Sequence, residues 1–130
     1  MNNYDYRVNL VDDYLKKLNL SNEIKKYYSG RNILVTGGAG AIGSNLVTTL
    51  SKLVGNDGMI IVLDNLSAIK GDEPIDLPPL SNMMFVNGDI RNDIDLKRVF
   101  REKPTIVYHL AAFFANQNSV DYPETSADVD

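Results

Sequence analysis

The sequence of 130 residues contains no cysteine and only one histidine, His109. Without cysteine, the chain can build neither a disulfide framework nor a thiolate metal site, and such a composition fits a reducing compartment. We therefore expect a cytoplasmic protein without a bound metal. His109 lies at the end of an apolar run and has no second histidine or thiol to act with, which favours a structural role over a catalytic one.

Basic residues are also few: the chain has 13 Lys and Arg and 17 Asp and Glu, which gives a net charge of −4. Nucleic-acid binding requires a basic surface, so no nucleic-acid partner is expected. Residues 32–51 carry no charge, but their four glycines and several Ser, Thr and Asn do not suit a membrane span. The N-terminus lacks the basic and then apolar layout of a signal peptide. The length predicts a single globular domain with a modest core.

A glycine-rich turn stands between an apolar run and an amphipathic segment. Residues 33–35 predict a short buried strand, and residues 42–54 place apolar side chains at helical spacing before a possible cap at Gly55. The glycines between them follow the spacing G-x-x-G-x-x-G at Gly37, Gly40 and Gly43. A turn of this kind brings backbone N–H groups and a helix N-terminus to a pyrophosphate.

Other interpretations of this turn are weaker. A nucleoside-triphosphate loop requires Lys and then Ser or Thr after its last glycine, whereas Ser44 and Asn45 follow here. A methyltransferase turn stays possible in principle, although the residues that follow favour a dinucleotide. A glycine-rich turn without any ligand is the remaining alternative.

A second apolar run over residues 59–63 predicts a strand that is buried on both faces and ends at Asp64. Its distance from Gly43 suits the acidic residue that accepts hydrogen bonds from the adenosine ribose in dinucleotide-binding folds. Because a carboxylate repels a 2′-phosphate, this position favours NAD over NADP. The alternative is an Asp that only forms a turn with Asn65.

The remaining sequence continues the alternation of strands and helices. Residues 67–82 are rich in proline and predict a loop in place of a crossover helix, whereas residues 83–86 and 105–110 predict strands. Asp93 is the expected N-cap of the helix between these strands, and a last helix should begin near Pro123. Right-handed crossovers then give an α/β fold, a Rossmann-type doubly wound parallel sheet with strand order 3-2-1-4.

Residues 1–30 form a separate segment before this unit. They predict a pair of helices, the second capped by Ser21 and ended near Gly30. The helices either pack on the flank of the domain or, because their faces are rich in tyrosine, act as an oligomerisation arm. We expect residues 31–130 to form the cofactor-binding domain.

Four short motifs occur in this order: T-G-G-A-G-A-I-G-S at 36–44, D-N-L-S at 64–67, G-D-I-R at 88–91 and H-L-A-A at 109–112. Together they resemble the extended short-chain dehydrogenase/reductase family over residues 31–130. The likeness is greatest to nucleotide-sugar epimerases and dehydratases of the UDP-glucose 4-epimerase type. The resemblance implies that NAD takes a hydride from the sugar and usually returns it.

The resemblance also implies which positions contact NAD. They are Gly37, Gly40, Ala41, Ile42, Gly43, Asp64, Asn65, Asp89, Ile90, Leu110, Ala111 and Ala112. The positions up to Gly43 would meet the pyrophosphate, Asp64 and Asn65 the adenosine ribose, and Asp89 and Ile90 the adenine. The last three would line the path to the nicotinamide ribose.

The sequence departs from the family in several places. Ala41 replaces a position that is often aromatic, and Phe114 stands near the place of a cofactor-contacting lysine. The catalytic Tyr-x-x-x-Lys pair of the family is absent, because none of the seven tyrosines is followed by lysine four positions later. We therefore expect no catalytic residue in this chain. It should be the N-terminal part of a longer enzyme, truncated before the catalytic pair and the sugar-binding domain and inactive alone.

Three functions follow from the sequence. The first is the NAD-binding portion of a nucleotide-sugar epimerase or dehydratase, with a nucleotide sugar as substrate of the whole protein. The second is a non-catalytic NAD-binding or regulatory module, and the third is an NADP-dependent reductase of the same family. In the order 3-2-1-4, the apolar strand 105–110 lies at an open edge, and such edges pair with other chains. We therefore expect the chain to be poorly soluble or a homo-oligomer.

Overall fold

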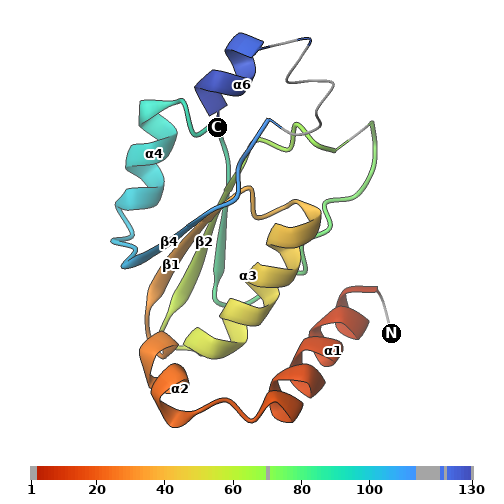
Figure 1. The fold of residues 1–130 in the computed structure, drawn as a ribbon, viewed down its shortest axis with the longest axis vertical. Helices are drawn as coiled ribbons and strands as arrows, with labels where there is room; N and C mark the ends of the chain where they lie inside the picture. Colours follow the sequence, from red (N-terminus) through yellow and green to blue (C-terminus); the bar gives the residue numbers. More distant parts are fainter. Residues whose placement is uncertain (1–2, 70, 114–120, 122, 130) are drawn as a thin grey trace.

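The computed structural model of the chain describes residues 3–69, 71–113, 121 and 123–129. Its elements follow one another as an α/β alternation preceded by two helices (Figure 1). They are α1 Asn3–Leu18, α2 Asn22–Tyr28, β1 Asn32–Thr36, α3 Ala41–Val54, β2 Met59–Asp64, β3 Met83–Asn87, α4 Asp93–Phe100, β4 Ile106–His109 and α6 Pro123–Val129.

The strands form one parallel sheet in the order β3-β2-β1-β4, which confirms the predicted topology. The register places Thr36 at the end of β1 beside Leu63 and His109, while Asp64 pairs with Asn87. The carboxyl ends of all the strands therefore meet at one edge. The segments that follow them, including the glycine-rich turn, emerge side by side at that edge, where α/β folds bind their ligands.

The two faces of the sheet are covered by different helices, α3 on one side and α4 on the other (Figure 1). Because side chains alternate along a strand, Ile33 and Val35 join Val47 of α3 in one core, whereas Leu34 joins Val99 of α4 in the other. β2 is inaccessible on both faces, as its continuous apolar run predicts. The two cores hold the sheet from both sides and fix the edge that carries the turn.

The helix ends follow capping chemistry, with one correction to the sequence prediction. Ser21 caps α2 as expected, since its Oγ accepts from the N–H of Ile24 at 3.3 Å. The N-cap of α4 is Asn92 rather than Asp93. Asn92 Oδ1 accepts from the N–H of Ile94 and of Asp95 at 2.8 and 3.2 Å. Asp93 lies instead in the first turn of α4, where its charge suits the helix dipole.

The connection from β2 to β3, residues 65–82, contains no helix among its described residues, as its prolines predict. The N-terminal helix α1 packs beside α3 and holds this connection (Figure 1). Tyr4 Oη donates to the carbonyl of Ile75 at 2.7 Å, and Arg7 bonds both the carbonyl and the carboxylate of Asp76 at 2.8 and 2.7 Å. Side chains of α1 thus satisfy carbonyls that a crossover helix would satisfy internally.

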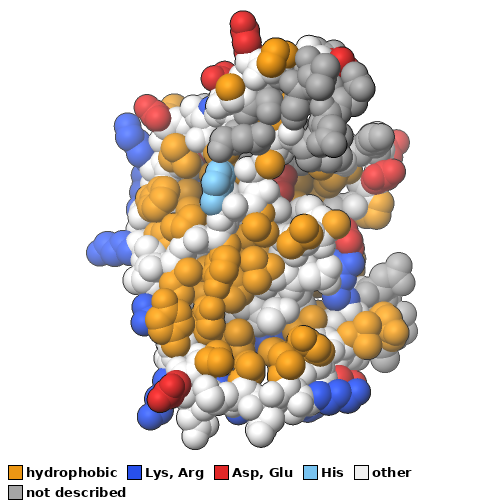
Figure 2. Space-filling model, viewed as in Figure 1, with side chains coloured by type: hydrophobic (Ala, Val, Ile, Leu, Met, Phe, Trp, Pro, Cys, Tyr) orange, Lys and Arg blue, Asp and Glu red, His pale blue; other side chains and the backbone are white. Residues whose placement is uncertain are grey.

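At the other end of the sheet, β4 is an edge strand of the described chain. Val107 is 48% exposed and Leu110 37% exposed. Apolar side chains gather along β4 and the adjoining flank of α3 on the face shown in Figure 2. α2 reaches this edge, where the hydroxyls of Tyr28 and Tyr108 lie 2.7 Å apart. The apolar edge strand predicted from the sequence is therefore present, and the oligomeric state expected from it stays a prediction.

Candidate cofactor-binding site

The glycine-rich turn packs so tightly that side chains are excluded from it. Gly37 has a φ of +69°, and a Cβ there would lie 2.7 Å from the backbone nitrogen of Ala111. A Cβ on Gly43 would overlap the carbonyl oxygen of Gly37 and lie 2.7 Å from the Cα of Gly38. Gly40 is the N-cap of α3 and has an ordinary φ of −74°. The close packing therefore requires glycine at Gly37 and Gly43, whereas the requirement at Gly40 is weaker.

Gly38 is a position to which the sequence analysis gave no role. A Cβ there would lie 2.6 Å from Cγ1 of Val62 on β2 and 3.2 Å from Cγ2 of Val47 on α3. The turn thus packs directly on the core side chains of both neighbouring elements. The sequence does indicate this position, because Gly38 directly follows Gly37, but the G-x-x-G-x-x-G spacing does not include it.

The first turn of α3 carries Ala41 and Ile42, whose side chains are exposed, Ile42 by 76%. The first turn of a helix leaves backbone N–H groups without partners inside the helix, and these groups are at the positive end of its dipole. Gly40, the N-cap of α3, offers no side-chain cap. The site therefore presents bare backbone N–H groups, the arrangement that binds phosphate oxygens.

Asp64 ties the end of β2 to this turn. Its Oδ2 accepts from the N–H of Ala39 at 2.9 Å, and its Oδ1 accepts from the N–H of Leu66 at 2.8 Å. The backbone adds a second tie, because the N–H of Gly37 donates to the carbonyl of Leu63 at 2.9 Å. A carboxylate has about four lone-pair sites, so two further hydroxyl groups can donate to Asp64.

Asp89 follows β3 and is held by Arg91. The guanidinium Nη2 lies 2.7 Å from Oδ2, while Nε and the backbone N–H of Arg91 donate to Oδ1 at 3.0 and 2.9 Å. These hydrogen bonds, with a smaller one from Asn65, lower the pKa of Asp89 to about 2. Asp89 is therefore an anion at neutral pH, with its carboxylate plane fixed.

The loop around Asp89 is itself built around Asp95 of α4. Asp95 Oδ2 accepts from the N–H of Asp89 at 2.9 Å, and a Cβ on Gly88 would lie 2.6 Å from Cγ of Asp95. Asn65 forms a similar local turn, since its Oδ1 accepts from the N–H of Ser67 at 3.0 Å. Ile90 packs against the core under α4. These contacts fix each loop locally, and the N–H of Gly88 donates to the carbonyl of Asp64 at 3.1 Å, which holds the segments after β2 and β3 beside each other.

The segment after β4 lies against the turn through Thr36. Its Oγ1 is 2.6 Å from Nδ1 of His109 and accepts from the N–H of Ala111 at 3.3 Å. The N–H of Leu110 donates to the carbonyl of Thr36 at 3.0 Å. This network supports the structural interpretation of His109. It also explains why Leu110 and Ala111 approach Gly37, with the exposed Ala112 next in the chain.

The structure brings all the predicted cofactor positions to the carboxyl edge of the sheet. Phe114 and most of the segment between β4 and α6 lie outside the described residues. Thr36 and Arg91 belong to the motifs that the sequence analysis recognised, but their contacts could not be predicted from spacing. Over the described ranges, no group of three or more His, Cys, Asp or Glu is placed to hold a metal ion.

No helix in the described part of the chain combines the length and apolar character needed to cross a bilayer. The site offers a set of backbone N–H groups at the N-terminus of α3, flanked by the carboxylates of Asp64 at the end of β2 and of Asp89 in the loop after β3. The N–H groups can bind the phosphates of a nucleotide, and the carboxylates can accept hydrogen bonds from its hydroxyl and amino groups.

Comparison with known proteins agrees with this geometry. The family described as GDP-mannose 4,6 dehydratase matches residues 34–130. A CDP-paratose 2-epimerase of Salmonella typhi is 42% identical over 94 residues, which are 70% of this chain and 27% of that enzyme.

Solved structures are similar as well. The epimerase Mth375 of Methanothermobacter thermautotrophicus is 50% identical, with a TM-score of 0.70 over 80% of this chain and 29% of its own. The Bordetella bronchiseptica enzyme WbmF, solved in complex with NAD+, is 33% identical with a TM-score of 0.68 over 79% of this chain and 29% of its own. This chain thus spans less than a third of the length of these relatives. It belongs to the GDP-mannose 4,6 dehydratase family of nucleotide-sugar epimerases and dehydratases, within the extended short-chain dehydrogenases/reductases.

Proposed function

We propose that this chain is the NAD-binding portion of a nucleotide-sugar epimerase or dehydratase. Residues 31–130 would form the NAD-binding domain and residues 1–30 its helical extension. The observation that carries the proposal is the hydrogen bond from the N–H of Ala39 to Asp64 Oδ2. It places the acidic residue beside the pyrophosphate-type turn, and NAD recognition in this fold uses both.

Each part of the site has a role in this proposal. The N–H groups at the start of α3 hold the pyrophosphate, and the unused lone pairs of Asp64 accept from the adenosine ribose with Asn65 beside it. The charged carboxylate of Asp89 accepts from the 6-amino group of adenine, whose face rests on Ile90.

The positions Leu110, Ala111 and Ala112 line the path to the nicotinamide ribose in this proposal. When bound, NAD supplies reversible hydride transfer with the sugar. The carboxylate of Asp64 stands where a 2′-phosphate would be repelled, which supports NAD over NADP.

The sugar chemistry belongs to the whole protein. WbmF has also been solved in complex with NAD+ and UDP, which supports a nucleotide sugar as the substrate class. We propose that a Tyr-x-x-x-Lys pair outside these 130 residues acts on the sugar and that this chain alone does not turn over substrate. The cytoplasmic location expected from the sequence stays a prediction.

Titration of the 130-residue chain with NADH, followed by the fluorescence of the nicotinamide, tests the proposal. We expect saturable binding, a preference for NADH over NADPH, and an NADH dissociation constant about tenfold higher in Asp64→Asn. Asp57→Asn, at an exposed position outside the site, is the matched control and should bind as the parent does.

Absence of NADH binding by a folded chain would contradict the proposal, and a preference for NADPH would favour the reductase alternative. If the chain binds NADH but a longer protein carrying it is inert on every nucleotide sugar, the non-catalytic module is the better interpretation.

A further inference from the structure

The backbone of Asp89, in the loop after β3, is bonded by the N-terminal end of α4. Its N–H donates to Oδ2 of Asp95 at 2.9 Å, and its carbonyl accepts from the N–H of Asn92 at 2.9 Å. Asn92 is the N-cap of α4, and Asp95 lies three residues later in the first turn of that helix. The start of α4 therefore determines where the backbone of Asp89 lies at the carboxyl edge of the sheet.

Asp95 uses a helix-capping position in an unusual way. It lies three residues after the N-cap, where a Glu or Gln side chain commonly turns back to bond the N–H of the N-cap residue. In this chain the N–H of Asn92 already donates to Asp89. The carboxylate of Asp95 reaches past it to the N–H of Asp89, a backbone donor outside the helix. The positive end of the α4 dipole favours its charge at this place.

The residue before Asp89 shows how closely Asp95 packs against the loop. A Cβ on Gly88 would lie 2.6 Å from Cγ and 2.7 Å from Oδ2 of Asp95. The N–H of Gly88 donates to the carbonyl of Asp64 at 3.1 Å, so Gly88 is held against the end of β2 as well. Asp95 thus packs on the loop backbone in addition to bonding it, and glycine at position 88 leaves room for this contact.

The carboxylate of Asp89 is directed by a different residue. Arg91 donates to its Oδ1 from Nε and from the backbone N–H, and to its Oδ2 from Nη2. Arg91 belongs to the same loop, so it orients the carboxylate only relative to that loop. Asp95 belongs to α4 and fixes the loop relative to the domain. The carboxylate of Asp89 keeps one place at the site only when both contacts are made.

We propose that Asp95 is a positioning residue that determines the preference of this site for adenine. The inference rests on the proposed function, in which Asp89 accepts from the 6-amino group of the base. The pyrophosphate at α3 and the ribose at Asp64 fix where the purine lies, so the base does not follow a displaced carboxylate. Hydrogen bonds weaken steeply when they are misaligned. A loop released from Asp95 therefore still binds the dinucleotide but no longer distinguishes the group at C6 of the purine.

Reduced nicotinamide hypoxanthine dinucleotide, compared with NADH, tests this proposal. The two differ only in the purine, where an oxo group and an N1–H replace the 6-amino group of adenine, and nicotinamide fluorescence reports the binding of both. For the 130-residue chain we expect the hypoxanthine analogue to bind about 30-fold more weakly than NADH, because its oxo group faces a carboxylate. In Asp95→Ala the two dissociation constants should differ by about threefold or less.

Three further variants separate positioning from a general loss of stability. Asp95→Asn keeps an oxygen acceptor for the N–H of Asp89 and should retain the parent difference. Asp93→Ala removes the same charge from an exposed position in the same turn of α4 and should also behave as the parent. Gly88→Ala places a methyl group where the Asp95 carboxylate lies and should reduce the difference as Asp95→Ala does.

An Asp95→Ala chain that keeps the parent difference between the two dinucleotides would overturn the inference, and so would an equal loss in Asp93→Ala. If far-UV circular dichroism shows that Asp95→Ala is unfolded, Gly88→Ala decides, and an unchanged difference there would overturn the inference. A parent chain that binds NADH and the analogue equally well would overturn it while leaving NAD binding intact. A parent chain that binds neither would refute the proposed function and the inference together.

Discussion

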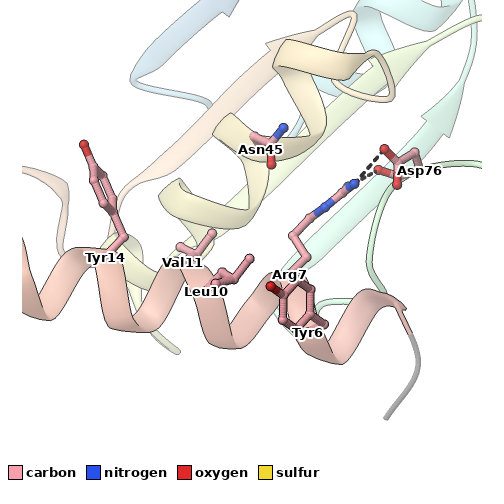
Figure 3. A pocket seen from close by; sticks show the side chains of 7 residues that line it. All are labelled: Tyr6, Arg7, Leu10, Val11, Tyr14, Asn45 and Asp76. Carbon is pink, nitrogen blue, oxygen red and sulfur yellow. Dashed lines mark hydrogen bonds and ion pairs between the residues drawn. The ribbon is translucent and has the colours of Figure 1, made fainter.

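The two connections that cover the same face of the sheet are built in different ways. α3 joins β1 to β2 as a regular helix that buries its own Val47, Leu50 and Val54. Its carbonyls before the last turn are bonded within the helix. The connection from β2 to β3 has no helix in its described residues and contributes Leu77 to the same core. Its carbonyls at Ile75 and Asp76 are bonded by Tyr4 and Arg7 of α1, and Figure 3 shows Arg7 directed toward Asp76.

The difference shows two solutions to one physical requirement. A chain that crosses a sheet must cover apolar side chains and also pair its backbone polar groups. A helix does both with local sequence, whereas an irregular connection requires partners from elsewhere. Here the partner is a segment about 70 residues earlier in the chain, as the separations of 71 and 69 positions for these hydrogen bonds show.

The largest effect is expected where the regular connection meets the turn. Gly43→Ala places a methyl group against the backbone of Gly37 and Gly38, which cannot move aside, and should lower the free energy of unfolding by about 3 kcal/mol. Urea denaturation measures the loss. Gly40→Ala is the control, because its Cβ would come only within 3.4 Å of the Gly37 oxygen. Equal losses in both variants would refute the steric explanation.

A smaller effect is expected where α1 holds the irregular connection. Arg7→Met keeps the length of the side chain but removes the donors to Asp76, and should lower the free energy of unfolding by about 1 to 2 kcal/mol. Arg7 Nη1 also lies 3.4 Å from Ser44 Oγ in the first turn of α3. Amide hydrogen exchange should therefore accelerate in residues 71–81 and remain unchanged in α4, on the other face of the sheet. Arg98→Met on the exposed face of α4 is the control. Uniform acceleration across the chain would show that the contact is not local to the connection.

The smallest effect is expected at the contact between α2 and the sheet. Tyr28→Phe removes the hydroxyl bonded to Tyr108 and should lower the free energy of unfolding by about 1 kcal/mol. The pH dependence identifies the contact, because burial and the Tyr28 hydroxyl raise the pKa of Tyr108 to about 12.

A raised pKa means that the folded state favours neutral Tyr108. The associated stability is complete below pH 10, the usual pKa of tyrosine, and is lost as the pH rises from about 10 to about 12. Urea titrations across this range should show the decline in the parent and a smaller decline in Tyr28→Phe. An identical decline in both would mean that burial alone, without Tyr28, raises the pKa.

The helical connection, α3, could be predicted from the sequence, whereas the contacts that hold the irregular connection from β2 to β3 could not. Apolar spacing predicted α3 and the buried strands β1 and β2, because those patterns are local. Proline showed that residues 67–82 lack a helix but gave no sign that Arg7 would bond Asp76. The N-cap of α4 was assigned one residue late because Asn92 and Asp93 are both good caps and only the backbone conformation decides between them.

The candidate site also has positions that could be predicted from the sequence and contacts that could not. The motif spacing indicated Gly37 and Gly43, because the turn leaves no room for a Cβ there. It indicated Asp64 because this residue ends the second strand at a suitable distance from the turn. The bond between Thr36 and His109 depends on the pairing of β1 with β4, two strands whose bonded side chains are 73 positions apart in the chain. Such contacts depend on the register of the two strands, which the predicted strand order does not give.

The hydrogen bond between Ala39 and Asp64 has a consequence for protein engineering. Coenzyme preference in this fold is commonly attributed to the acidic residue alone, as if it could be exchanged freely. In this chain the same carboxylate also shapes the loop that precedes α3. A redesign toward NADP that replaces Asp64 by an apolar or basic residue would leave the Ala39 N–H without its acceptor. A successful redesign must therefore supply another acceptor at that point.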